Sequence, residues 1–553
     1  MTKSKSKQHI NNKENQVEGN APSAFSRYSL IRRWKHKRHG GILLVIALLT
    51  AILMSVPLIY VIVRSFFAGK ERWLKLLDER IPELLWNTLS LTFFVTFFAV
   101  VIGVSIAWIV NRTDLPGRKV WAWALALPLV IPPYVGAVAY LIFLGPRGWM
   151  YDIWQKIPWL KGDYPFDMYT FWGIFFVLTM FTYPYVYLIA SAALRRMNRN
   201  YEEVARSQGM NMWQVFWKVN LPLLRPAIGA GAILIALYVI SDFGAIAMLR
   251  YMTFTSAIYY QMGSYDNLSA TVLSVILIAL TLIILWIEGR LTKKGGYVQS
   301  ATGSIRKPDI IPLGKWKWMA LVFLGVVFFI AVLLPIIVLV YWAFIGFQEG
   351  AYDAKFWVYA FNSFKVSGLA ALISMLLALP VIYLKSRYPS VLSRTIEKLS
   401  YSGYALPGVI VALGIIFVFN NTPLYNTFYL LIVAFVIRFL PQAMQAQEAS
   451  LSLMSPRIDE AAQSLGTPPW KVMLTVILPS ILPGILAGGA LVFVSSIKEL
   501  PATLLLRPPG YDTMAIRIWT EASEALYHLA ALPALLIILI SAIPLRYMLQ
   551  MRK

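Results

Sequence analysis

Two carboxylates lie at the ends of apolar stretches in this sequence, where a charged side chain is costly to place. Asp242 and Glu499 are 257 residues apart, and each follows a stretch long enough to cross a membrane. An ionisable side chain in such a position has a functional or charge-pairing role by default. Carboxylate oxygens are ligands that hard cations prefer. Phenol oxygens from three tyrosines could join them: Tyr134, Tyr238 and Tyr511.

The same positions also have a plainer interpretation. The two carboxylates could cap helix ends, or pair with Arg250 and Arg507 at the outer surface. Arg438, inside the apolar stretch 424–446, is predicted to be a gate or an interhelical pairing residue. Its place near a span end also permits its side chain to reach the interface. The residue 257 positions earlier is Phe181, so this cation has no counterpart.

A polar segment occurs twice, again 257 residues apart, and both copies fit Glu-x-Ala-x3-Gly-x9-Val-x-Leu-Pro without a gap. The defining residues are Glu203, Ala205, Gly209 and Pro222 in the first copy and Glu460, Ala462, Gly466 and Pro479 in the second. Each copy predicts two short helices, because glycine can take the left-handed conformation that ends the first. Proline is expected to end the second. The retained spacing indicates one surface built twice for two copies of one partner, although two amphipathic loops left over from a duplication would read alike.

Composition sets the class of protein. Of 553 residues, 58% are hydrophobic and 14% are charged, with a mean hydropathy of +0.64, which indicates a polytopic membrane protein. The absence of cysteine excludes disulfides, iron–sulfur clusters and thiolate metal sites. Three of the four histidines lie in the N-terminal tail, which argues against a histidine-rich metalloenzyme. The net charge of +24 is explained by basic membrane loops, so no nucleic-acid partner is expected.

Twelve apolar runs come near the spanning length of about 20 residues. They fall at about 42–67, 87–110, 121–144, 170–194, 226–248, 267–288, 317–345, 363–384, 402–420, 424–446, 480–497 and 526–548. The resulting domains are a basic, disordered tail (1–41), a first module of six spans (42–288), a linker (289–316) and a second module (317–553). Arginine and lysine are concentrated in segments on the N-terminal side of the membrane. Both termini, the linker and both repeated loops are therefore expected in the cytoplasm, and an even number of spans makes the halves parallel.

The repeated loop resembles the EAA loop of ATP-binding cassette importer permeases, Glu-Ala-Ala-x3-Gly-x9-Ile-x-Leu-Pro, whose first helix docks onto a cytoplasmic ATPase. This sequence departs from it at Val204, Val219 and Val476. Two copies in one chain resemble the fused permeases that include ferric-iron, thiamine and aminoethylphosphonate importers. Three stretches are similar to the ferric-iron branch: 127–136 (LPLVIPPYVG), 241–245 (SDFGA) and 498–508 (KELPATLLLRP).

The resemblance implies an all-α type I importer permease with twelve transmembrane helices in two parallel six-helix repeats, in a bacterial cytoplasmic membrane. The repeated loops would couple to two ATPase copies, and an extracytoplasmic binding protein would deliver ferric iron. Ferric iron is a hard cation, so Asp242 and Glu499 make chemical sense along its path. The sequence holds no Gly-x4-Gly-Lys-Ser/Thr phosphate-binding loop. The chain would then be no enzyme and bind no cofactor, with ATP used by the partner subunit.

Three alternatives remain open. The permease could carry another solute, such as thiamine or aminoethylphosphonate. A six-plus-six secondary transporter fits the span count, but it predicts no repeated docking loop. A polytopic membrane enzyme, such as a lipid-linked transferase, would use the acidic residues of the loop 498–525, which are Glu499, Asp512, Glu521 and Glu524. No nucleophile or metal-binding pattern connects these four residues.

Overall fold

The computed structural model describes residues 41–157, 164–198, 200–294, 310–352, 354–455 and 457–551. Within these ranges the chain is helical, with one isolated β-bridge and no strand. The expected tail, apart from Gly41, lies outside the described residues, and so do residues 295–309 of the expected linker. The helix before that linker runs six residues beyond the expected boundary, to Lys294.

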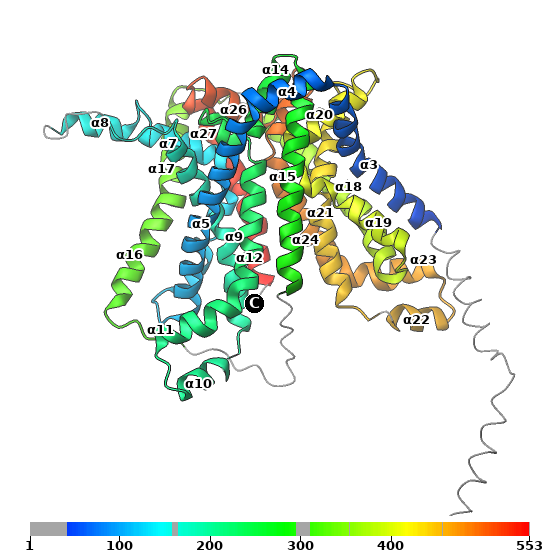
Figure 1. The fold of residues 1–553 in the computed structure, drawn as a ribbon, viewed down its shortest axis with the longest axis horizontal. Helices are drawn as coiled ribbons and strands as arrows, with labels where there is room; N and C mark the ends of the chain where they lie inside the picture. The colour runs from blue at the N-terminus through cyan, green and yellow to red at the C-terminus, as the bar shows by residue number, and fades with distance from the viewer. Residues whose placement is uncertain are drawn as a thin grey trace, which may run out of the picture.

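Ten helical segments are long and apolar enough to cross a membrane in the part of the chain that the structure describes. They are built on α3 (Gly41–Phe66), α5 (Ile81–Arg112), α9 (Phe171–Arg196), α12 (Leu221–Ser241), α15 (Asn267–Lys294), α16 with α17 (Trp316–Phe328 and Leu334–Gln348), α18 (Ala354–Arg387), α21 (Phe428–Ser452), α24 (Leu478–Ile497) and α27 (Tyr527–Met551). Together they form one elongated bundle (Figure 1). The expected fold class, an all-α membrane protein made of two repeats, is confirmed.

Two of the expected spans are sharply bent rather than straight. In the first half, α6 (Arg118–Ala124) and η1 (Leu127–Val130) meet the segment Pro133–Lys156, which begins with α7 (Pro133–Leu144), at 94°. In the second half, α19 (Val391–Ser400) and η5 (Ser402–Ala405) meet α20 (Gly408–Phe419) at 109°. Proline explains both bends, because it lacks the N–H needed to continue a helix and disfavours helical geometry in the preceding residue. The total is twelve spans if each bent pair counts as one.

The two halves have the same orientation. The short loop helices α10 (Asn200–Ser207) and α22 (Arg457–Ser464) lie at the lower end of the bundle (Figure 1). Helices α14 (Phe254–Gly263) and α26 (Met514–Ser523) lie at the opposite end. In the first half, α8 (Trp149–Lys156) extends sideways from the bundle near that opposite end.

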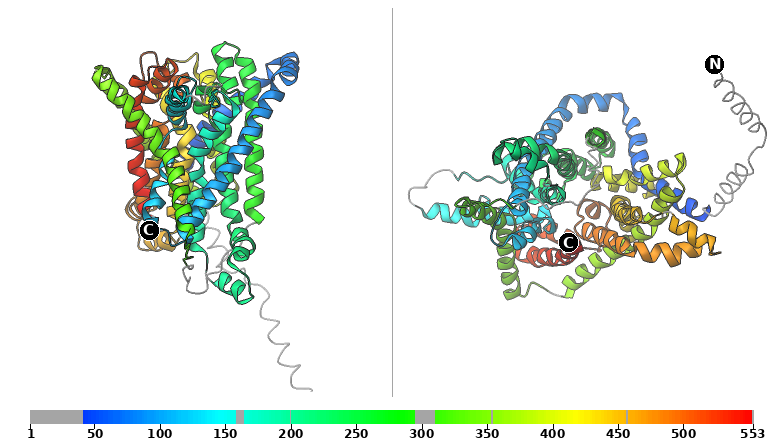
Figure 2. Two further views of the ribbon diagram at one scale, coloured as in Figure 1. Left: turned by 90° about the vertical axis from the view of Figure 1, so that its left-hand side faces the viewer. Right: turned by 90° about the horizontal axis from the view of Figure 1, so that it is seen from below.

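The first helix of each half contacts the other half as well as its own. Helix α3 contacts α18, α19 and α20, and Figure 2 shows it beside those second-half helices. Ser402 Oγ donates to Met54 O of α3 at 3.0 Å. In the reverse direction, Tyr140 of α7 donates its hydroxyl to Ile330 O at 2.9 Å, within the turn that joins α16 to α17. The exchange interlocks the halves, so neither module of six consecutive spans packs as a separate unit.

Candidate functional site

The repeated loops fold alike. Gly209 and Gly466 end the first loop helices with φ of +81° and +85°. The amide of the residue after Gly209 donates to Ala205 O at 3.2 Å, and the amide after Gly466 donates to Ala462 O at 3.2 Å. This pattern satisfies carbonyls that a helix end would otherwise leave unpaired. The predicted glycine-terminated helix is therefore present in both copies.

The prolines of the loops do not end the second helix, contrary to the sequence prediction. Helix α11 (Met212–Val215) continues through a π turn, Phe216–Asn220, into α12, and Pro222 is the second residue of α12. The second copy repeats this with α23 (Pro469–Val472), a π turn at Met473–Ile477 and α24, which begins at Leu478-Pro479. A π turn contains one extra residue, so it tolerates a proline that would break a regular helix. Each loop is thus joined to its span by continuous helix.

The remaining predicted loop residues differ in exposure. Glu203 and Glu460 are exposed on the first loop helices. Ala205 is buried within the chain, whereas Ala462 is half-buried. A partner that approaches the loops would therefore reach Ala462 more readily than Ala205. The coupling role of all these residues stays a prediction.

A buried ion pair ties each loop to a spanning helix. Arg112, the last residue of α5, pairs with Glu202 of α10, and the two side chains are 1% and 3% exposed. Arg387, the last residue of α18, pairs with Asp459 of α22 across 2.7 Å, with both side chains 7% exposed. The sequence contains evidence for this equivalence, because Glu202 and Asp459 are also 257 residues apart. Each stands just before the more obvious glutamate of the loop.

Aromatic packing supports the first of these pairs. The Arg112 guanidinium lies over the Trp108 ring, 5.3 Å from its centroid. Trp108 in turn packs edge-on against Phe216, in the π turn of the loop, with centroids 4.7 Å apart. The last turn of α5 therefore contacts both helical parts of the loop. A movement of the loop would reach α5 and α12 together.

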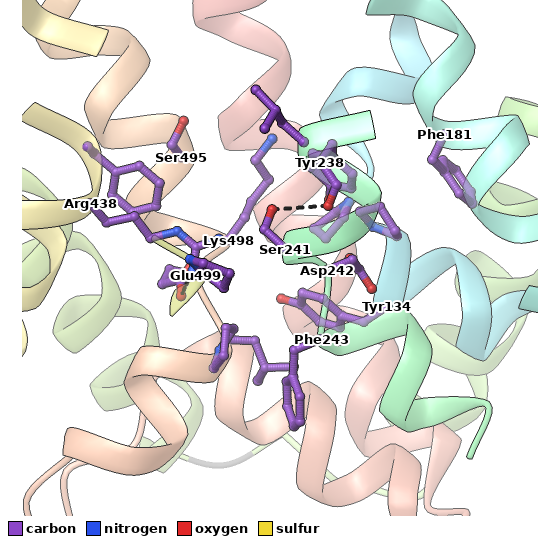
Figure 3. Close-up of a pocket in the computed structure, with 18 of the residues that line it drawn as sticks. Tyr134, Phe181, Tyr238, Ser241, Asp242, Phe243, Arg438, Ser495, Lys498 and Glu499 are labelled. Atoms are coloured by element: carbon purple, nitrogen blue, oxygen red, sulfur yellow. Dashed lines mark hydrogen bonds and ion pairs between the residues drawn. The ribbon is translucent and has the colours of Figure 1, made fainter. Parts of the chain in front are cut away.

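A cavity of about 280 Å³ lies between the two halves. Its walls come from the bent segments η1–α7 and η5–α20, from α9 and α21, and from the ends of α12 and α24. Of the six predicted pathway residues it is lined by five: Tyr134, Tyr238, Asp242, Arg438 and Glu499. In Figure 3, Arg438 and Glu499 lie on one side, and Asp242, Tyr134 and Tyr238 lie on the other.

Glu499 is both a helix cap and half of an ion pair. Its Oε1 lies 2.6 Å from Arg438 Nη1 and accepts from the Ala502 amide at 3.3 Å, at the start of α25 (Pro501–Leu506). The pairing role expected for Arg438 is thus observed. The expected partner Arg507 pairs with Asp512 instead.

Asp242 caps a helix in the equivalent place. Its Oδ1 accepts from the amides of Ala245 and Ile246 at 3.1 and 3.3 Å, in the first turn of α13 (Gly244–Met248). The expected partner Arg250 lies instead over the Tyr169 ring, 5.4 Å from its centroid. The two carboxylates therefore cap equivalent helices, but the one with an observed ion-pair partner in the cavity is Glu499.

The cavity also contains groups that the sequence interpretation misjudged or missed. Tyr511 does not line it; its ring stacks on Phe428 and its hydroxyl lies 3.5 Å from Asn362 O. Tyr134 is 4% exposed, and its buried hydroxyl has no hydrogen-bond partner among the described residues. Lys498 was missed, although it precedes Glu499 in sequence, and its Nζ donates to Leu129 O at 3.1 Å.

Two like helical halves, a cavity between them that contains charged side chains, and a matching loop on each define a membrane permease. The chain belongs to the family of binding-protein-dependent transport system inner membrane components, whose model matches residues 99–294 and again 370–549. It is a multi-pass membrane protein of the fused two-module type.

Similarity to individual proteins extends along nearly the whole chain. It is 35% identical over 512 residues to the Fe(3+)-transport system permease protein FbpB 2 of Haemophilus influenzae, covering 91% of this chain and 96% of the relative. Identity to the ferric transport system permease protein FbpB of Actinobacillus pleuropneumoniae is 26% over 535 residues, 91% of this chain and 77% of that protein. The thiamine transport system permease protein ThiP of Salmonella typhimurium is 23% identical over 473 residues, covering 82% and 87%.

The enzyme alternative loses its support at the loop 498–525. Asp512 is paired with Arg507 and Arg517, Glu521 with Arg517, and Glu499 with Arg438. Among the described residues, no cluster of three or more His, Asp or Glu side chains could hold a metal ion. Three of the four carboxylates of this loop, Glu499, Asp512 and Glu521, are thus paired with arginines.

Proposed function

We propose that this chain forms the membrane pathway of a bacterial ATP-binding cassette importer for ferric iron. The observation that carries the proposal is the cavity between the halves, where Asp242 and Glu499 hold equivalent positions. Ferric iron is a hard cation that prefers carboxylate and phenol oxygens. The 35% identity to a Fe(3+)-transport system permease supports the same cargo.

The partners follow from the two ends of the bundle. Two copies of a cytoplasmic ATPase would each bind one loop, and an extracytoplasmic binding protein would deliver cargo at the opposite end. The excess of Lys and Arg on the loop side supports a cytoplasmic location for both loops and both termini. The chain would bind no cofactor of its own, and the ATPase would supply the energy.

The route from ATPase to cavity runs through continuous helix and the two buried ion pairs. Closure of the ATPase would move the first loop helices. Arg112 and Arg387 would carry that movement to α5 and α18, while the π turns would carry it to α12 and α24. Because Asp242 and Glu499 follow the ends of α12 and α24, the cavity would change with the loops. A rigid-body shift of one half against the other then switches access from one side to the other.

ATPase docking is tested by placing tryptophan at Gly209 and Gly466 together, since each has positive φ and open space beside it. We expect the double variant to lose the ATPase in a pull-down. Gly510→Trp is the matched control, because that glycine also has positive φ and open space but lies in the loop before α26, at the opposite end. A double variant that retains both the ATPase and normal transport would contradict docking at these loops.

The cargo is tested by uptake into proteoliposomes that contain the complete complex. We expect ⁵⁵Fe to accumulate only when ATP is present on the side of the membrane that carries the ATPase. Labelled thiamine should not accumulate. Thiamine or aminoethylphosphonate uptake would instead support the second candidate, a permease for another small solute, which the 23% identity to a thiamine permease favours. Uptake driven by an ion gradient without ATP would support a secondary transporter.

A further inference from the structure

The cavity has matched negative charges but unmatched positive charges. Asp242 and Glu499 are counterparts across the 257-residue offset. At the same offset, Arg438 corresponds to Phe181 and Lys498 to Ser241. All four of these positions line the cavity. The second half alone therefore contributes an arginine and a lysine.

Contact between the two halves does not by itself explain why a lysine stands at position 498. Its Nζ donates one hydrogen bond, to Leu129 O of the first half at 3.1 Å. A neutral donor could make that bond without the cost of taking a charge out of water. An ammonium group also has three donors, so two remain for another acceptor in the cavity.

The ion pair between Arg438 and Glu499 occupies space that is free because residue 408 is glycine. A Cβ atom on Gly408 would overlap the Arg438 guanidinium and the Glu499 carboxylate. Pro132 and Pro407 directly precede the first residues of α7 and α20, so Pro133 is the counterpart of Gly408. The second half thus has no side chain where the first has proline, and the space holds the ion pair.

The four charges decide what form of iron fits. At their ordinary ionisation, two carboxylates, one arginine and one lysine sum to zero. A bare trivalent ion would be repelled by both cations and would find no excess negative charge to compensate it, in surroundings of low polarity. An iron ion that keeps an oxyanion ligand solves this problem. The oxyanion offers oxygens to the arginine and lysine, which are groups that bind carboxylate and phosphate.

We infer that the cargo crosses this cavity as a ferric ion still bound to a small oxyanion. Lys498 and the donors of Arg438 not used by Glu499 contact the oxyanion, while Asp242 and the unpartnered Tyr134 hydroxyl face the metal (Figure 3). A volume of about 280 Å³ lies just below the range of roughly 300–1,000 Å³ for drug-sized ligands. It admits iron with one or two small anions. The inference rests on the proposed transport of iron.

The test is dual-label uptake by the complete complex in proteoliposomes. ⁵⁵Fe is supplied with ¹⁴C-citrate in one arm and ³²P-phosphate in the other, and both labels are counted inside. We expect at least one anion to accumulate with iron in a fixed ratio at every rate of transport. Lys498→Met should lower iron and anion uptake together by tenfold or more, and Lys498→Arg should restore most of it. Lys398→Met, a lysine exposed on α19, is the matched control and should transport normally.

The outcomes separate the two proposals. Iron that accumulates without either anion overturns the inference and leaves iron transport standing. Co-accumulation that is unchanged in Lys498→Met overturns the role given to Lys498. No iron uptake by the unaltered complex, with uptake of another solute, overturns the proposed function itself. Retention of the ATPase during purification shows that the Lys498 variants are folded.

Discussion

The loop end of this permease is nearly symmetric, whereas the cavity is not. At the loop end, both halves have a glycine of positive φ, a π turn before a Leu-Pro pair, and a buried arginine paired with a carboxylate. Among the charged side chains of the cavity, only the carboxylates match. The halves arose from one repeat, so the difference reflects what each region must contact.

Different contacts explain the difference. A loop that meets one of two identical partners must keep its shape in both copies. A cavity shared by the two halves holds one cargo, so each half is free to supply different groups. Under the proposed function, the asymmetric residues would recognise cargo and the symmetric residues would transmit movement.

The second half carries a further charged network between these two regions. Lys385 of α18 pairs with Glu397 of α19 at 2.5 Å and also with Glu448 of α21. The first-half counterpart of Lys385 is Val110, at the offset of 275 that also relates Arg112 to Arg387. The counterpart of Glu448 is Ser191, at the offset of 257. Asymmetry of charge thus extends from the cavity toward the loops.

The largest effect is expected from breaking the loop ion pairs. Arg112→Ala leaves Glu202 buried without its cation, and Arg387→Ala does the same to Asp459. Removal of one partner of a buried pair costs about 3–5 kcal/mol. Each variant should lower iron uptake more than 100-fold, and by similar amounts, because the pairs are equivalent. Thermal unfolding in detergent and ⁵⁵Fe uptake measure the two effects.

An exchange of charges separates stability from coupling. Arg112→Glu with Glu202→Arg restores opposite charges, so it should recover much of the unfolding temperature lost in Arg112→Ala. ATPase activity that is retained but no longer stimulated by the binding protein would show that the pair transmits movement. If Arg112→Ala and Arg387→Ala differ more than tenfold in uptake, the loops are not equivalent and the comparison fails.

The next effect separates the two carboxylates of the cavity. Glu499→Gln leaves Arg438 without its ion-pair partner, at a cost of about 3 kcal/mol. Asp242→Asn keeps an oxygen that can accept from the α13 amides, so its cost is about 1 kcal/mol. Unfolding temperatures should therefore fall more for Glu499→Gln, while both variants lose uptake. Equal losses of stability would mean that the cavity is electrostatically symmetric after all.

The sequence predicted well what depends on local pattern. Gly209 and Gly466 were predicted as helix ends because few other residues adopt positive φ, and they have it. The lengths of the apolar stretches predicted the spans. The shared offset indicated that Asp242 and Glu499 are equivalent, and both line the cavity. These features need no knowledge of which helices are neighbours.

Features that depend on neighbours were out of reach. The partner of Glu499 is 61 positions away on another helix, so the nearby Arg507 was the natural and wrong choice. The exchange of α3 onto the second half leaves no mark in hydropathy. Pro222 indicates a helix end unless a π turn precedes it. The residue types of the segment do not predict the hydrogen bonding of that turn. Tyr511 missed the cavity because its ring stacks on Phe428, a contact set by packing.

A smaller effect is expected at Gly408, where the second half makes room for its ion pair. Gly408→Ala forces the Arg438 and Glu499 side chains to shift, at about 1–3 kcal/mol for an overpacked site. Iron uptake should fall roughly tenfold. Gly229→Ala is the control, since a Cβ there meets nothing within 4 Å. Equal uptake by the Gly408→Ala and Gly229→Ala variants would show that the ion pair takes no part in transport.

The smallest effect is expected where the symmetry is closest. Gly209→Ala and Gly466→Ala place a side chain at φ of +81° and +85°, which costs roughly 1–2 kcal/mol per residue in the left-handed region. Apart from the adjoining residues of the chain, no atom of the described structure stands within 4 Å of either new methyl group, so the strain is confined to the backbone. Each variant should keep its ATPase and lose less than threefold of its uptake, and the two losses should agree within error. Unequal losses would show that one ATPase contact limits transport, and that structurally matched loops have already diverged in function.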